Sequence, residues 1–193
     1  MKFRVALIGI VFLLLGLTVL AVPAASHGQT PPREQLEAMS LLQHWVGLWQ
    51  GSGWAATGPR ERQEFQITET VSGKLGGSVL LLEGLGTTMT ESGDEIVTHN
   101  AIGLVSFDPA GGRYNLRSHD LRGSVHDSTL EIDGDVMRWA FRDESSGAQL
   151  RFEIRVEGDT WHEIGHVSPD GNENWYPMLE MTLHRQDATN EVN

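Results

Sequence analysis

Turn-forming residues recur along most of this chain, and their regular spacing constrains its fold more than any other feature. Clusters rich in Gly, Asp, Ser and Pro lie at 92–94, 108–112, 133–135, 145–147, 157–159 and 169–171. Such clusters favour hairpins and bulges, because glycine accepts positive φ and short polar side chains bond to the nearby backbone. Turns at intervals of about a dozen residues are typical of an antiparallel sandwich or barrel.

The segments between these turns alternate apolar and polar residues, as half-buried strands do. The period of two is clearest at 65–71, 97–107, 137–141 and 152–156. We therefore expect an all-β protein, an up-and-down antiparallel barrel of about ten strands. Because an eight-stranded barrel is just filled or holds one small ligand, a wider barrel is expected to enclose a cavity.

A short amphipathic helix is predicted before the strands. Apolar residues recur at helical spacing from Leu36 to Trp45, which predicts a helix that ends near Trp45. Thr30 is a favourable N-cap and Pro31 suits the first helical position. The barrel domain is expected to span 33–187.

Residues 1–26 have the pattern of a secretory signal peptide. Lys2 and Arg4 form a basic start, 5–22 is an apolar stretch, and 23–26 supplies small residues for cleavage. The alternative is an uncleaved anchor, because the apolar stretch nearly reaches the length of a spanning helix. Both interpretations predict an exported protein, periplasmic or extracellular, and cleavage would leave no stable membrane insertion.

The composition excludes several classes of function. Asp and Glu number 26 against 14 Lys and Arg, for a formal net charge of −12. Such a surface repels phosphate backbones, so we expect no nucleic-acid partner. There are 0 cysteines, which excludes disulfides, thiolate metal sites and cysteine nucleophiles.

The sequence from His162 to His166 matches H-E-x-x-H, the zinc-protease pattern. That chemistry needs a helix, on which the two histidines share a face and Glu163 acts as general base. Here turn clusters flank the motif closely, and an extended motif would have its third ligand at Asn172. We expect a strand with both histidines on one face, about 13 Å apart, and no zinc.

The segment 45–54 resembles the opening of lipocalin-like (calycin) barrels. In that family a short helix leads into a Gly-x-Trp strand, which Gly47 and Trp49 match, and the tryptophan closes one barrel end. With Gly51 and Gly53 the pattern becomes Gly-x-Trp-x-Gly-x-Gly, which more distantly resembles nitrobindin-like heme barrels.

The chain after the signal segment also resembles a family of uncharacterised secreted bacterial proteins, a domain-of-unknown-function family with a lipocalin-like barrel. The matching segments are 58–60, 65–70, 76–86, 114–118, 163–165, 168–171 and 180–183. This resemblance implies a fold and no particular reaction. For the nitrobindin comparison His162, His166 and His184 compete as heme ligand, so none is assigned.

Polar residues on apolar strand faces are candidates for a site inside the barrel, and these are Glu69, His99 and Glu163. Arg117 and His119, together on the more polar face of their strand, and the tryptophans Trp54 and Trp139 are further candidates. The carboxyl and imidazole groups would meet a ligand's polar group, and the arginine an anionic one. Each has a structural alternative: rim carboxylates in water, a core histidine, an outward ion pair, or core tryptophans. Strand parity by itself does not show which face points inward.

The sequence thus predicts an exported barrel that binds a small apolar or amphipathic ligand in its lumen, without catalysis and with no identified cofactor. The alternative is a heme or tetrapyrrole barrel with His99, His162 or His166 as axial ligand. A third class is a hydrolase or isomerase that pairs Glu69 or Glu163 with His99.

Overall fold

The computed structural model describes residues 30–171 and 174–187, so the predicted signal segment 1–26 lies outside the described residues. The elements are α1 (Arg33–Ser40), η1 (Gln43–Trp45), β1 (Gly47–Ala56), β2 (Arg62–Lys74), η2 (Leu75–Gly77), β3 (Val79–Met89), β4 (Glu95–Asp108), β5 (Arg113–Asp120), β6 (Val125–Asp133), β7 (Val136–Arg142), β8 (Gln149–Glu157), β9 (Thr160–Ser168) and β10 (Tyr176–Gln186).

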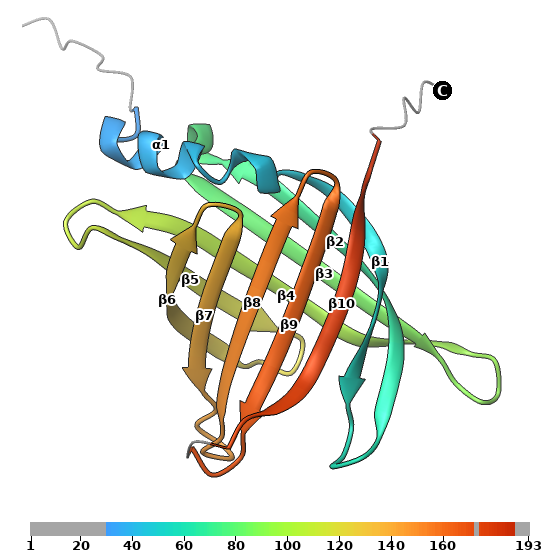
Figure 1. Ribbon diagram of the computed structural model, residues 1–193. Helices are drawn as coiled ribbons and strands as arrows, with labels where there is room; N and C mark the ends of the chain where they lie inside the picture. The colour runs from blue at the N-terminus through green and yellow to red at the C-terminus, as the bar shows by residue number, and fades with distance from the viewer. Residues whose placement is uncertain (1–29, 172–173, 188–193) are drawn as a thin grey trace, which may run out of the picture.

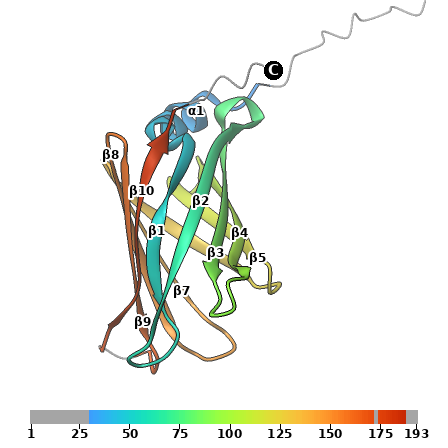
Figure 2. The same ribbon diagram turned by 90° about the vertical axis from the view of Figure 1, so that its right-hand side faces the viewer.

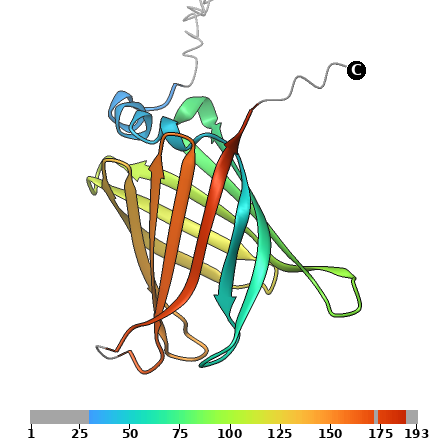
Figure 3. The same cartoon turned by 45° about the vertical axis from the view of Figure 1, so that its right-hand side comes forward.

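The ten strands form a closed antiparallel barrel, as the sequence predicts. Each strand pairs with the next along the chain, and β1 pairs with both β2 and β10 to close the sheet (Figure 1). Closure leaves no free sheet edge. The helix α1 and the β2–β3 connection lie together at one end of the barrel (Figures 2 and 3).

The helix is shorter than predicted and begins later. It starts after Pro32, which is the N-cap with no side-chain hydrogen bond, so the expected cap at Thr30 is wrong. Pro31 precedes another proline, which disfavours the helical region for it and delays the start. A separate 3-10 turn at Gln43–Trp45 replaces the last predicted helical turn. Within the described residues no helix has the length and apolarity to cross a membrane.

The strand pairing shows which side chains point into the barrel. Directly opposed residues on neighbouring strands share a face. Trp49 lies opposite Glu69 and Arg185, and Leu80 lies opposite Val105. Because Trp49, Leu80 and Val105 belong to the buried core, this register assigns an inward face to every strand.

One end of the barrel is closed by a cluster of tryptophans. The rings of Trp45 and Trp161 meet edge to face at 5.2 Å, and those of Trp49 and Trp161 do so at 5.7 Å. Trp49 Nε1 donates to the carbonyl of Trp45 at 3.0 Å. Tyr114 donates its hydroxyl hydrogen to the carbonyl of Ala38 at 2.8 Å, which fastens α1 over this end. We call Trp45, Trp49 and Trp161 the tryptophan plug.

The glycines after Trp49 permit a close approach of β1 to β10. A Cβ at Gly51 would collide with the carbonyl oxygen of Thr182, and one at Gly53 with the backbone and Cβ of Met181. The Gly-x-Trp-x-Gly-x-Gly pattern therefore has a physical reason, because these two strands close the barrel.

Candidate functional site

The lumen beyond the tryptophan plug contains four of the seven predicted site residues. Register places Glu69, His99, Trp139 and Glu163 on the inward faces of β2, β4, β7 and β9. A role for them in binding stays a prediction.

The other three predicted residues lie on the outer wall, which corrects the expectation that they line the lumen. Arg117 and His119 pair with Leu104 and Ile102, whose side chains face solvent. Arg117 Nε lies 3.7 Å from an Asp127 carboxylate oxygen, the outward ion pair that was the alternative interpretation. The reason is the parity of β5, whose buried Leu116 takes the inward position.

Trp54 also faces outward, because it lies five residues after the inward Trp49. Its Nε1 donates to Glu180 Oε2 at 3.3 Å. The guanidinium of Arg62 lies 3.6 Å from the ring centroid. Trp54 is thus a half-buried surface residue held by a cation–π contact and a hydrogen bond.

Glu69 is a buried carboxyl with no hydrogen-bond partner among the described residues. Only 9% of the residue is exposed. Its carboxyl lies above Gly84 on β3, where any side chain would overlap it. Burial raises the pKa of Glu69 to about 7, because the charged form loses its hydration.

Glu163 is the second buried carboxyl of the lumen, and 8% of the residue is exposed. Burial, and to a smaller extent the nearby charge of Glu69, raise the pKa of Glu163 to about 8, against a hydrogen bond from Trp161 that lowers it. That bond, from Trp161 Nε1 to Glu163 Oε2, is 3.4 Å long. Both carboxyls are therefore largely protonated below neutral pH, and each then has an O–H to donate.

A ladder of stacked rings lines the lumen on β6, β7 and β8. Trp139 stacks on Phe152 at 5.1 Å and 14°, and Phe152 on Phe141 at 6.0 Å and 15°. Phe141 stacks on His126 at 4.0 Å and 23°. All four residues are half-buried rather than fully buried. We call this set the ring ladder.

Of the ring ladder, only Trp139 was predicted from the sequence as a site residue. Strand alternation could also have indicated Phe141, because it lies two residues after Trp139 and therefore on the same face. Phe152 directly opposes Trp139 on the next strand, and its ring fills the space where Gly165 of β9 has no side chain.

At the end away from the tryptophan plug, His99 and Asp120 line the mouth. His99 faces inward yet belongs to the exposed residues, so the lumen is accessible from this end. Burial lowers the pKa of His99, the Asp120 carboxylate partly offsets this, and Arg122 lowers it further. Asp120 Oδ1 accepts hydrogen bonds of 2.9 Å from the backbone N–H groups of Arg122 and Ser124.

The backbone pairing between β6 and β7 has a gap along part of its length. Only Glu131–Asp133 pairs with Val136–Arg138, and further on Ser128 Oγ donates to the carbonyl of Ala140 at 3.2 Å. A hollow of about 690 Å³ extends from β6 to β9 and is lined mainly by outward residues such as Arg138, with Ser128, Trp139 and Phe152 from the lumen face. A second hollow, of about 570 Å³, lies between β3 and β6 and is lined mainly by outward residues.

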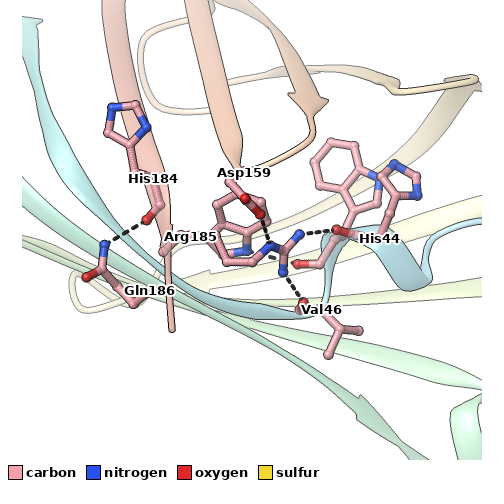
Figure 4. Close-up of polar contacts among 8 residues, drawn as sticks. His44, Val46, Asp159, His184, Arg185 and Gln186 are labelled. Carbon is pink, nitrogen blue, oxygen red and sulfur yellow. Dashed lines mark hydrogen bonds and ion pairs between the residues drawn. The ribbon is translucent and has the colours of Figure 1, made fainter. Parts of the chain in front are cut away.

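Arg185 of β10 completes the closed end of the barrel (Figure 4). Its guanidinium donates to the carbonyls of Val46 and His44 at 2.5 and 2.7 Å, and to Asp159 Oδ1 at 3.1 Å. It lies 4.0 Å from the centroid of the Trp49 ring. Each of its three nitrogens donates a hydrogen bond to the protein, so this group holds the plug in place.

The H-E-x-x-H segment lies on strand β9, as predicted. His162 and His166 share the outward face, because the intervening register places Glu163 and Gly165 inward. His162 Nε2 lies 3.3 Å from Glu180 Oε1. No group of three or more metal-binding side chains suited to a metal ion occurs in the described part of the chain.

Replacing both His162 and His166 with glutamine is expected to leave the barrel's stability almost unchanged. Both side chains point away from the core, and such surface positions change the free energy of unfolding by about 0.5 kcal/mol or less each. Urea unfolding of the double variant measures this. Stoichiometric zinc in the purified protein, lost together with peptidase activity in the double variant, would contradict the assignment.

The structure also shows which of the histidines named as possible heme ligands face the lumen. His162, His166 and His184 face outward, and His99 faces the lumen. For the acid–base hypothesis, no hydrogen bond joins His99 to Glu69 or Glu163 in the part of the chain that the structure describes. The lumen therefore holds two buried carboxyls, a ring ladder and one predicted imidazole near the mouth.

Two solved structures resemble this chain over most of its length. Rv2717c from M. tuberculosis is 18% identical over 82% of this chain and 100% of that chain, with a TM-score of 0.57. The S-type phycobiliprotein lyase CPES from Guillardia theta is 11% identical over 82% of this chain and 99% of its own, with a TM-score of 0.54. Similarity at this level shows the fold alone. No family model matches the sequence, and no curated protein does.

Proposed function

We propose that this protein is exported and binds a small apolar or amphipathic molecule in its lumen, without catalysing a reaction. The ring ladder carries this proposal. Large aromatic side chains are normally buried fully in a core. These four rings stack on one another along the lumen wall but stay half-buried, so their faces and edges are available to a ligand.

The surrounding groups support the same interpretation. The tryptophan plug closes one end, so a ligand would enter from the mouth or through the gap between β6 and β7. Glu69 and Glu163 offer a few polar contacts within an otherwise apolar wall, which is the usual composition of a small-molecule site. Export is proposed from the signal pattern of residues 1–26.

The proposal is tested with the mature chain purified from an exported preparation. Native mass spectrometry is expected to show a bound small molecule, or binding of members of a lipid, porphyrin and aromatic panel. Phe152→Ala is expected to weaken binding about tenfold, since an aromatic stacking contact contributes about 0.5–1.5 kcal/mol beyond its buried area. Trp54→Ala, on the outer wall, is the matched control and should bind normally. A protein that carries nothing and binds no panel member would refute the proposal.

One observation favours heme or a tetrapyrrole as a second candidate. His99 faces the lumen and its pKa is lowered, so its imidazole is neutral at physiological pH, as an axial ligand must be. Hemin titration of His99→Ala and of the outward control His162→Gln tests this. A Soret band lost only in the first variant supports heme binding, and equal weak binding by both variants indicates surface association.

A further inference from the structure

The charged groups that face the lumen are nearly all acidic. Between the tryptophan plug and the mouth, the register of the described strands places no Lys or Arg inward; Arg185 lies at the closed end, bonded to Asp159. Glu69 and Glu163 are therefore two buried carboxyls without a cation. Glu69 has no hydrogen-bond partner among the described residues.

The two carboxyls belong to one part of the lumen wall. β1 and β10 separate β2 from β9. Glu69 lies directly opposite Trp49 of β1, and Glu163 lies opposite Met181 of β10, while the next inward positions of β1, Gly51 and Gly53, carry no side chain. The charge of Glu69 acts on Glu163, so the two groups lie within electrostatic range of each other.

The ring ladder lies beside this carboxyl pair. Glu163 and Gly165 are successive inward positions of β9, and Phe152 directly opposes Gly165. Phe152 and Glu163 are thus diagonal neighbours on one face, a spacing of about 7–8 Å between Cα atoms that suits a ligand with a charged end and a flat body.

The loops around the mouth are acidic as well. The described residues of the five loops at this end are 57–61, 90–94, 121–124, 143–148, 169–171 and 174–175. Their acidic residues are Glu61, Glu91, Asp94, Asp143, Glu144 and Asp170, and their basic residues are Arg60 and Arg122. Such a rim attracts cations and repels anions.

We propose that the ligand of this lumen is an organic cation, an amine whose ammonium group lies between Glu69 and Glu163 and whose aromatic or apolar body stacks on the ring ladder. This inference rests on the proposed lumen binding and specifies its chemistry. Aromatic faces add to the attraction, because a cation near a ring gains cation–π energy. A carboxylate contacting the ammonium replaces the hydration that burial removes.

Binding of a cation is coupled to proton release. Both carboxyl pKa values are raised by burial, so at lower pH the amine must displace protons and its affinity falls. The titratable groups that face the lumen in the described strands are Glu69, His99, Tyr114, Asp120, His126, Glu163, Tyr176 and Arg185, and Arg122 lies near the mouth. Protonation of His99 also repels a cation, so it acts in the same direction.

Three ligands that share a naphthyl ring but differ in charge distinguish the effect of charge on binding from the effect of shape. They are 1-naphthylmethylamine, 1-naphthylmethanol and 1-naphthoate. We expect calorimetry of the mature chain at about pH 8.5 to show the amine binding at least about tenfold more tightly than the alcohol, with the naphthoate weakest. At about pH 6 the preference for the amine should shrink, with protons released on binding.

The double variant Glu69→Gln with Glu163→Gln should bind the amine and the alcohol equally, while the outward control Glu180→Gln should behave as the native chain. Thermal unfolding checks that each variant is folded. If the native chain binds the alcohol as tightly as the amine, or if the double variant keeps the preference, the amine proposal is wrong although lumen binding stands. If other members of the panel bind but none of the three naphthyl ligands does, the amine proposal is also wrong. If nothing binds, both proposals fail.

Discussion

Substituting Trp49 with alanine is expected to destabilise the barrel by about 3–5 kcal/mol, the usual cost of truncating a buried tryptophan. The side chain is 0% exposed and packs edge to face on Trp161. The substitution also removes the donor to the Trp45 carbonyl and the ring beneath the Arg185 guanidinium. Urea unfolding followed by circular dichroism measures the change in the free energy of unfolding.

Trp54→Ala is the matched control, because Trp54 lies on the same strand and faces outward. It loses one exposed hydrogen bond to Glu180 and the Arg62 contact, so its effect should stay within about 1 kcal/mol. Equal destabilisation by the two substitutions would contradict the assignment of the plug.

Stability is expected to fall as the pH rises from about 6.5 to 8.5, which is the opposite of the trend for a protein held by ionised carboxylates. Burial raises the pKa of Glu69 to about 7 and that of Glu163 to about 8, from 4.5. Above about pH 5 the unfolded state has released these protons, whereas the folded state keeps the proton of Glu69 up to about pH 7 and that of Glu163 up to about pH 8. Each pH unit below the folded pKa therefore removes up to about 1.4 kcal/mol per group, and the slope ends above about pH 8. Because the pKa of His99 is lowered, that histidine acts mainly below this window.

Urea unfolding across this pH range measures the slope. Glu163→Gln should flatten it and make the variant more stable than the native chain at about pH 8.5, because the amide stays neutral. Glu180→Gln, an exposed position on the outer wall, should keep the native slope. A stability that rises with pH in the native chain would show that folding does not raise the pKa values of the two carboxyls.

The sequence alone determined the architecture of this protein. Turn clusters at regular intervals predicted about ten antiparallel strands, which is confirmed. The resemblance of Gly47 and Trp49 to the opening of calycin barrels implied a tryptophan inside one barrel end, and Trp49 is buried in the core. Flanking turns likewise predicted that 162–166 is a strand rather than a zinc-binding helix, which is also confirmed. These features are local, because turn chemistry and side-chain alternation act over a few residues.

The alternation of residues along each strand was less informative about which side chains face the lumen than about the fold. Once Trp49 is placed inside, the odd spacing already puts Trp54 outside, so that prediction could have been corrected from the sequence. For Arg117 and His119 the decisive fact is the pairing of β5 with β4, whose outer face carries exposed Ile102 and Leu104. Alternation in β5 places Arg117 and His119 on its polar face, opposite in parity to Tyr114 and Leu116, but it does not show whether that polar face lines the lumen or the outer wall.

Only the tertiary structure decided which groups meet in the lumen. Glu69 and Glu163 come from strands far apart in the chain, and the pairing of β1 with β10 brings these strands to one part of the wall. The ring ladder likewise depends on the register of three strands, because stacking requires opposed residues on one face. The raised carboxyl pKa values follow from burial, a property of the closed barrel that no single segment contains.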